Sequence, residues 1–238
     1  ESLQNTFRNA DSFIQPLNNW TTSSLLNLAD TFKDNASFNQ NLSNWDTSSV
    51  IYMNGTFQNT VFNNAKSSGV SDTFQWDTSS VTRMDNMFEN ATDFNGNISG
   101  WNVSNVTDMS FMFYSSLFNK PLEKWNVSKV KNMRGMFKEC SFNQPIGSWN
   151  VGSVENMSNM FSGNGTLGIY NTFDQPIGDW NVSKVKDMEG MFCVNLPFNQ
   201  PIGNWDVSNV TNMSSMFSSS RKFNQPIGTW NVRNVLNM

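Results

Sequence analysis

Nine tryptophans recur at near-constant spacing, and this recurrence is the strongest constraint on how the chain can fold. Successive tryptophans lie 25, 31, 25, 24, 24, 31, 25 and 25 residues apart. A fixed period of about 20 to 50 residues is typical of repeat architectures, in which each unit packs only against its neighbours. We therefore expect residues 1–238 to form a single repeat array with one tryptophan per unit. The anchoring residues are Trp20, Trp45, Trp76, Trp101, Trp125, Trp149, Trp180, Trp205 and Trp230.

Other residue types keep fixed distances from the tryptophan, and we call residues at the same distance a column. The unit that begins at Trp205 carries Val207, Val210, Met213 and Met216. All 14 methionines of the chain lie either 8 or 11 residues after a tryptophan. Methionine normally fills irregular gaps in a core. Its restriction to two columns therefore indicates equivalent core pockets in every unit.

The pattern within a unit predicts one short strand and one tight helical turn. Segments that end at the tryptophan, such as 146–149 and 202–205, favour a short parallel strand, and six of the seven prolines lie four residues before a tryptophan, where pairing would begin. After the tryptophan come residues of the helix N-cap type and then apolar residues at every third position, which favours a 3₁₀ or α turn. We therefore expect a leucine-rich-repeat-like solenoid. It would be a right-handed stack of short parallel β-strands with tight helical turns, in about nine units of 24–25 residues.

Two of the intervals are longer than the others, and their extra residues predict surface loops. These residues fall at about 63–73 in one unit and at 163–171 in another, and both segments are rich in Gly, Ser and Asn. Because they occupy corresponding places in their units, we expect both loops on one edge of the array. Neither end resembles a polar capping unit, so we also expect the array to be a segment of a longer protein.

Composition argues against catalysis. The chain has no histidine, and charged residues make up 14% with a net charge of −4. Imidazole bases, Ser-His couples and histidine-ligated metals are therefore excluded. Asp46, Asp77 and Asp206 share the column after the tryptophan with asparagines of other units, which indicates capping rather than catalysis. We expect no enzyme activity, no catalytic residue, no cofactor and no metal site.

The same figures limit the partners. Weak overall charge gives little attraction for a polyanion, so a nucleic-acid partner is not expected. No apolar run reaches the roughly 18 residues of a membrane-spanning helix, so we expect no direct membrane insertion by this segment.

Three columns are candidate binding surfaces. The tryptophans could form a stacking platform for sugars or bases, but their strict recurrence favours a buried ladder. The Asn column six residues before the tryptophan is either a ligand-facing strip or an internal ladder that satisfies the backbone, and the ladder is favoured. The Gln column beside it is the better candidate for a solvent-facing binding strip. It consists of Gln144, Gln175, Gln200 and Gln225, with Gln15 in the same place.

The two cysteines are predicted to be free thiols. Cys140 and Cys193 belong to units two steps apart, or roughly 10 Å along a stack of paired strands. Disulfides require Cα atoms within about 7 Å.

The repeat resembles a known family. The unit Phe-Asn-Gln-Pro-Ile-Gly-Asn-Trp-Asp-Val-Ser-Asn-Val-Thr-Asn-Met-Ser-Ser-Met-Phe, at 198–217, is similar to the repeat of BspA-like leucine-rich-repeat surface proteins, many of them lipoproteins of unknown function. The resemblance covers essentially the whole chain. It implies a secreted or surface-anchored, non-enzymatic protein, and several members take part in adhesion to host matrix proteins or other cells.

Three functions are compatible with these patterns. The leading hypothesis is an extracellular surface module for adhesion to, or recognition of, host or matrix proteins or glycans. The second is a structural spacer, or a building block of a surface coat or appendage that self-associates with like arrays. The third is a carbohydrate-binding protein.

Overall fold

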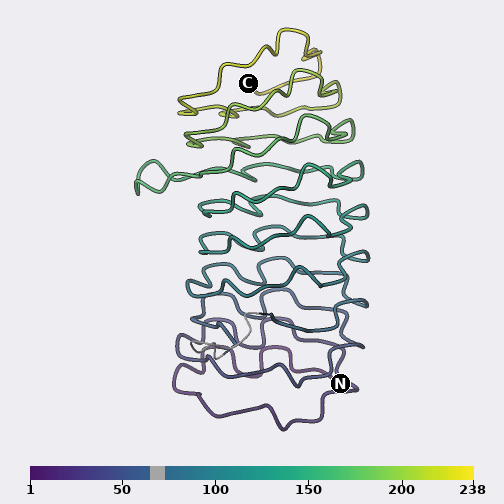
Figure 1. Ribbon diagram of the computed structural model, residues 1–238, viewed down its shortest axis with the longest axis vertical. Helices are drawn as coiled ribbons and strands as arrows, with labels where there is room; N and C mark the ends of the chain where they lie inside the picture. The colour runs from purple at the N-terminus through teal and green to yellow at the C-terminus, as the bar shows by residue number, and fades with distance from the viewer. Residues whose placement is uncertain (65–72) are drawn as a thin grey trace.

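The chain winds into successive turns that stack along the long axis of the molecule (Figure 1). The computed structural model describes residues 1–64 and 73–238. The N-terminus lies at one end of the stack and the C-terminus at the other. Each turn of the chain corresponds to about one sequence unit, and we call such a turn a layer. No helix in the described part of the chain is long and apolar enough to span a membrane.

The predicted leucine-rich-repeat-like fold is wrong, because residues 1–64 and 73–238 contain neither a helix nor a continuous strand. In these two ranges, β-type pairing is limited to isolated bridges. A parallel series of them runs the length of the stack, from Ser2 through the residue seven positions after each tryptophan, and we call these residues the bridge column. Its members are Ser2, Asn27, Tyr52, Arg83, Asp108, Asn132, Asn156, Asp187, Asn212 and Asn237.

The segment predicted as a strand is a tight turn. In the 202–205 segment, the backbone N–H of Trp205 donates to the carbonyl oxygen of Ile202 at 3.1 Å, which closes a four-residue turn. A Cβ on Gly203 would lie 2.5 Å from the carbonyl oxygen of Pro226 in the next layer, so this turn requires glycine. The sequence was misleading because both ends of such a turn direct an apolar side chain inward.

The segment predicted as a helical turn is a series of turns with left-handed residues. In the first full layer, the N–H of Thr31 donates to the carbonyl oxygen of Leu28 at 3.1 Å, and the N–H of Phe32 donates to Thr56 of the next layer at 3.0 Å. Asp30 and Asp34 have positive φ angles of 53° and 59°. A left-handed residue at every fourth position cannot continue a right-handed helix. We call this segment, 28–35 and its equivalents, the turn ladder.

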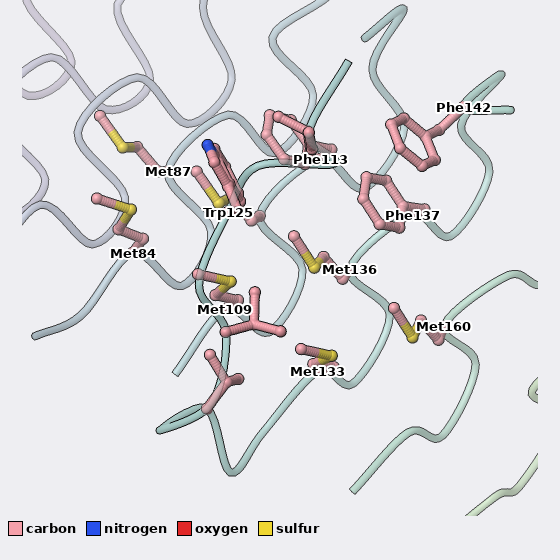
Figure 2. Packing of buried hydrophobic residues seen from close by; sticks show 14 of the residues in the cluster. Met84, Met87, Met109, Phe113, Trp125, Met133, Met136, Phe137, Phe142 and Met160 are labelled. Carbon is pink, nitrogen blue, oxygen red and sulfur yellow. The ribbon is translucent and has the colours of Figure 1, made fainter. Parts of the chain in front are cut away.

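The core lies inside the turns and is built from identical side chains placed above one another. Rings of successive layers stack, with centroids 5.6 Å apart for Phe113 and Phe137 and 6.5 Å apart for Trp125 and Trp149. Figure 2 shows methionines and phenylalanines of successive layers, such as Met133, filling the same interior space. Such aromatic pairs contribute about 0.5–1.5 kcal/mol each beyond area burial. The buried residues form one continuous cluster along the stack.

The second predicted loop lies on the surface, as expected. Asn164 and Ile169 exchange backbone hydrogen bonds of 2.6 and 2.9 Å in an antiparallel bridge. The resulting hairpin projects from the side of the stack (Figure 1, green), and Leu167 and Tyr170 are exposed on it. Most of the first predicted loop, 65–72, lies outside the described residues.

Candidate functional site

The tryptophans belong mainly to the core, which confirms the favoured interpretation. Seven of the nine are buried, at 3–4% exposure. Each of these seven donates its indole N–H to a backbone carbonyl of the preceding layer, as Trp149 does to Leu122 at 3.0 Å. Trp20, near the N-terminal end, is 42% exposed, and Trp230, in the last layer, is half-buried. The buried rings cannot act as a stacking platform for sugars.

The Asn column forms the predicted internal ladder. Asn143 shows the arrangement, because its Oδ1 accepts the backbone N–H of Asp174 in the next layer at 3.0 Å. The same bond joins successive members along the stack. The oxygens that accept belong to Asn39, Asn95, Asn119, Asn143, Asp174 and Asn199.

The structure brings the four predicted glutamines together on the edge beside this ladder. All four are half-buried, and each donates its side-chain N–H to the Asn-column residue of the preceding layer. The distances for Gln144, Gln175, Gln200 and Gln225 are 3.0, 3.0, 2.9 and 3.1 Å. The amide donors are therefore engaged in joining the layers, and a binding role for this strip stays a prediction.

The acids after the tryptophans cap turns, as predicted. Oδ1 of Asp206 accepts the backbone N–H of Ser208 at 3.1 Å, and Asp77 makes the equivalent bond. Asp46 accepts hydrogen bonds from the side chain and the backbone N–H of Ser48, and these bonds lower its pKa. Among the described residues, no group of three or more Cys, Asp or Glu side chains comes together as a metal site would require.

Both cysteines are free, as predicted. Cys140 is buried, and loss of hydration raises the pKa of its thiol to about 11. Cys193 is half-buried, and its pKa is raised for the same reason. Neither thiol is thereby activated as a nucleophile, because the thiolate is the reactive form.

Two columns, four and six residues after the tryptophan, are largely exposed and differ in chemistry from layer to layer. Their members are stacked in register, since the backbone N–H of Glu155 donates to the carbonyl oxygen of Lys131 at 2.8 Å and the same bond recurs along the stack. We call these two columns the variable face. The column six residues after the tryptophan contains Leu26, Ile51, Thr82, Thr107, Lys131, Glu155, Lys186, Thr211 and Leu236.

An open pocket of about 430 Å³ lies on the variable face. It is lined by Glu155, Lys184, Lys186, Asn209 and Thr211, which come from three consecutive layers. Nζ of Lys186 lies 2.7 Å from Oε2 of Glu155. This hydrogen bond lowers the pKa of Glu155, and the charges of neighbouring lysines lower it further. The pocket contains two of the four lysines of the variable face, and the averaged charge of the chain conceals them. The pairs Lys129–Lys131 and Lys184–Lys186 were the sequence feature that could have identified it.

A stack of near-identical layers with one face of changing chemistry defines a repeat-array protein. The family model described as "Mycoplasma protein of unknown function, DUF285" matches residues 1–68, 59–170 and 165–238. The chain therefore belongs to this repeat family. No curated protein and no solved structure matches the chain.

Proposed function

We propose that this protein is a non-enzymatic, extracellular recognition module that binds proteins or glycans through the variable face. The observation that carries the proposal is the difference between the columns that join the layers and the variable face. The Trp and Asn columns repeat because they hold the layers together, whereas the exposed residues of the variable face change along the stack. Positions whose chemistry changes while the stack is kept are the ones available for a ligand.

The sequence likeness to BspA-like surface proteins supports adhesion and a cell-surface location. That likeness rests on the repeat motif at 198–217 and not on the fold, because the layers lack the strands and helical turns of leucine-rich repeats. A rigid stack held by repeated backbone hydrogen bonds suits the presentation of an extended surface.

The test is a binding screen of the whole chain against immobilised matrix proteins and a glycan panel. We expect saturable binding that is lost in the variant T107E/T211E, which places negatively charged side chains on the variable face. The comparison variant is Q144E/Q225E, which makes the same charge change on the glutamine strip at positions whose side-chain partners, Asn119 and Asn199, are neutral. Thermal unfolding of both variants checks that the stack is intact.

The two variants separate the candidate surfaces. Loss of binding in Q144E/Q225E alone would move the site to the glutamine strip and overturn our choice of face. Absence of saturable binding by the unmodified chain across the panel would overturn the recognition function itself.

A further inference from the structure

We propose that the variable face carries a binding site for an acidic polysaccharide, centred on Lys129, Lys131, Lys184 and Lys186. We call these four residues the lysine cluster. The proposal rests on the proposed function and names its ligand class. The two pairs occupy identical columns in two layers, within the identical tetrapeptides Ser-Lys-Val-Lys at 128–131 and 183–186.

The cluster is fixed by the backbone of three successive layers. The N–H of Glu155 donates to the carbonyl oxygen of Lys131 at 2.8 Å, and the N–H of Lys186 donates to that of Glu155 at 2.8 Å. Neighbouring chains paired in this way lie about 4.8 Å apart, so the two lysine pairs are about 10 Å apart. The positive charges are therefore held in two rows with one layer between them.

One carboxylate is shared among several ammonium groups. Glu155 pairs with Lys186 at 2.7 Å, while Lys131 and Lys184 also lower its pKa through their charge. Lys129 donates to a neutral partner, Oδ1 of Asn105, at 2.7 Å. Within residues 1–64 and 73–238, neither Lys131 nor Lys184 has a carboxylate within salt-bridge distance. Four cations facing one anion leave a local positive excess on a chain whose net charge is −4.

The surroundings favour a sugar acid over other anions. Asn209 and Thr211 line the pocket beside the lysines, and each donates one hydrogen bond to the preceding layer, to the carbonyl oxygens of Ser183 at 2.8 Å and Lys186 at 3.1 Å. The amide oxygen and second N–H of Asn209 and the accepting lone pairs of the Thr211 hydroxyl remain for neutral sugar hydroxyls. The pocket volume of about 430 Å³ lies within the usual range of small-ligand sites, about 300–1,000 Å³, and suits a single charged sugar unit.

Nucleic acid fits this surface less well. Duplex DNA carries one charge per roughly 1.7 Å of its axis, so it would extend far beyond four lysines onto an otherwise acidic chain. Proteins that bind single strands also supply aromatic side chains on which bases stack. The two columns of the variable face contain no aromatic residue. A polysaccharide with sparse charges separated by neutral groups matches the spacing of the lysine pairs better.

The experiment measures binding of the whole chain to dextran sulfate and to hyaluronan, with neutral dextran as the uncharged control. We expect saturable binding to at least one charged probe, none to neutral dextran, and weaker binding as salt rises. The variant K184Q/K186Q should bind about tenfold more weakly, because it removes one of the two lysine pairs. The matched control is R221Q/K222Q, which makes the same charge change at an exposed basic pair outside the variable face and should change affinity less than about twofold.

A second pair of variants tests the direction of the effect. E155Q removes the protein's own carboxylate, which competes with the ligand for the lysines, so the affinity for the charged probe should rise. D206N removes an exposed carboxylate in a column where other layers already carry Asn, and it should leave binding unchanged.

Several results would overturn the inference. Equal weakening by K184Q/K186Q and R221Q/K222Q would mean general charge attraction, and equal affinity for a single-stranded oligonucleotide or for anionic lipid vesicles would mean a different ligand class. Binding only to a matrix protein or a neutral glycan would leave the recognition function standing and refute the lysine site. Binding to no probe and to no member of the recognition panel would refute both.

Discussion

At the scale of single residues, the most informative positions are those with left-handed backbone. Two positions of the turn ladder have positive φ in most layers, and they are occupied mainly by Asn, Asp, Ser or Gly. Gly, and to a smaller extent Asn and Asp, tolerate the left-handed region with little steric cost. Phe111 departs from the pattern with a φ of 56°, and its ring extends toward Gly135 of the next layer. A bulky residue in this conformation is a genuine outlier.

The contact between Phe111 and Gly135 predicts a coupled pair of substitutions. A Cβ on Gly135 would lie 2.4 Å from Cε1 of Phe111, and Gly135 itself has a φ of 58°. Gly135→Ala should therefore lower the free energy of unfolding by about 2 kcal/mol or more, of which roughly 1 is the left-handed backbone cost. In a Phe111→Ser background the loss should fall to about 1 kcal/mol. Denaturant unfolding measures both.

The control for this cycle is Gly100→Ala. Gly100 is exposed and has no positive φ, and a Cβ added to it would have no neighbouring atom within 4 Å, so the change should stay within about 0.5 kcal/mol. If Gly135→Ala lowered the free energy of unfolding equally with and without the Phe111 ring, the ring would not be the reason for glycine at position 135.

Cys140 gives a prediction for the alkaline range. Its thiol has a pKa of about 11 in the fold, above the value of about 8.5 for an exposed thiol. A group whose pKa is raised by folding adds to the free energy of unfolding. This contribution is complete at pH values below the pKa that the group has in the unfolded chain. That contribution is lost as pH rises from about 8.5 to about 11. The free energy of unfolding should therefore fall over this range, and by less in Cys140→Ala, as shown by denaturant titrations at several pH values. Parallel curves for the two proteins would contradict the assignment.

At the scale of the element, the Asn column joins the layers and predicts a graded set of effects. Oδ1 of Asn143 accepts two hydrogen bonds, from the backbone N–H of Asp174 and from Nε2 of Gln175, both at 3.0 Å. Asn143→Ala should cost about 1–2 kcal/mol, because both donors lose their partner. Asn143→Asp should be tolerated, since Asp174 fills the same role in its own layer. Denaturant midpoints give the comparison.

Asn224 is the matched control for that column. Its backbone N–H donates to Asn199 at 2.9 Å, but its side-chain oxygen accepts no backbone N–H among the described residues. Asn224→Ala should therefore cost less than about 0.5 kcal/mol. A loss as large as that of Asn143→Ala would mean that the side-chain oxygen is not what stabilises the column.

The sequence predicts the columns of this fold better than its local backbone. The recurrence of Trp149 and its equivalents identified the core, and the capping role of Asp206 was also correctly inferred. The strand and helical turn were wrong because apolar residues at every third position also arise from consecutive turns. The left-handed positions, such as Asp30, were the feature that distinguishes the two. The lysine cluster escaped notice because charge was averaged over the chain.

At the scale of the whole molecule, one layer can stand in for another where the same contacts recur between successive layers, as do the indole hydrogen bonds of Trp125 and Trp149. Deletion of 102–125 removes one 24-residue unit and joins Trp101 to Asn126, which keeps every column in register. The shortened chain should still unfold cooperatively, with a smaller denaturant m-value because less surface is exposed. It retains the lysine cluster, so its affinity for dextran sulfate should be unchanged if the parent chain binds. Deletion of 102–113 alone shifts the columns by half a layer and would place core side chains on the surface. That chain should fail to fold, as seen in tryptophan fluorescence and limited proteolysis, and a folded product would show that register between the layers is not what specifies the stack.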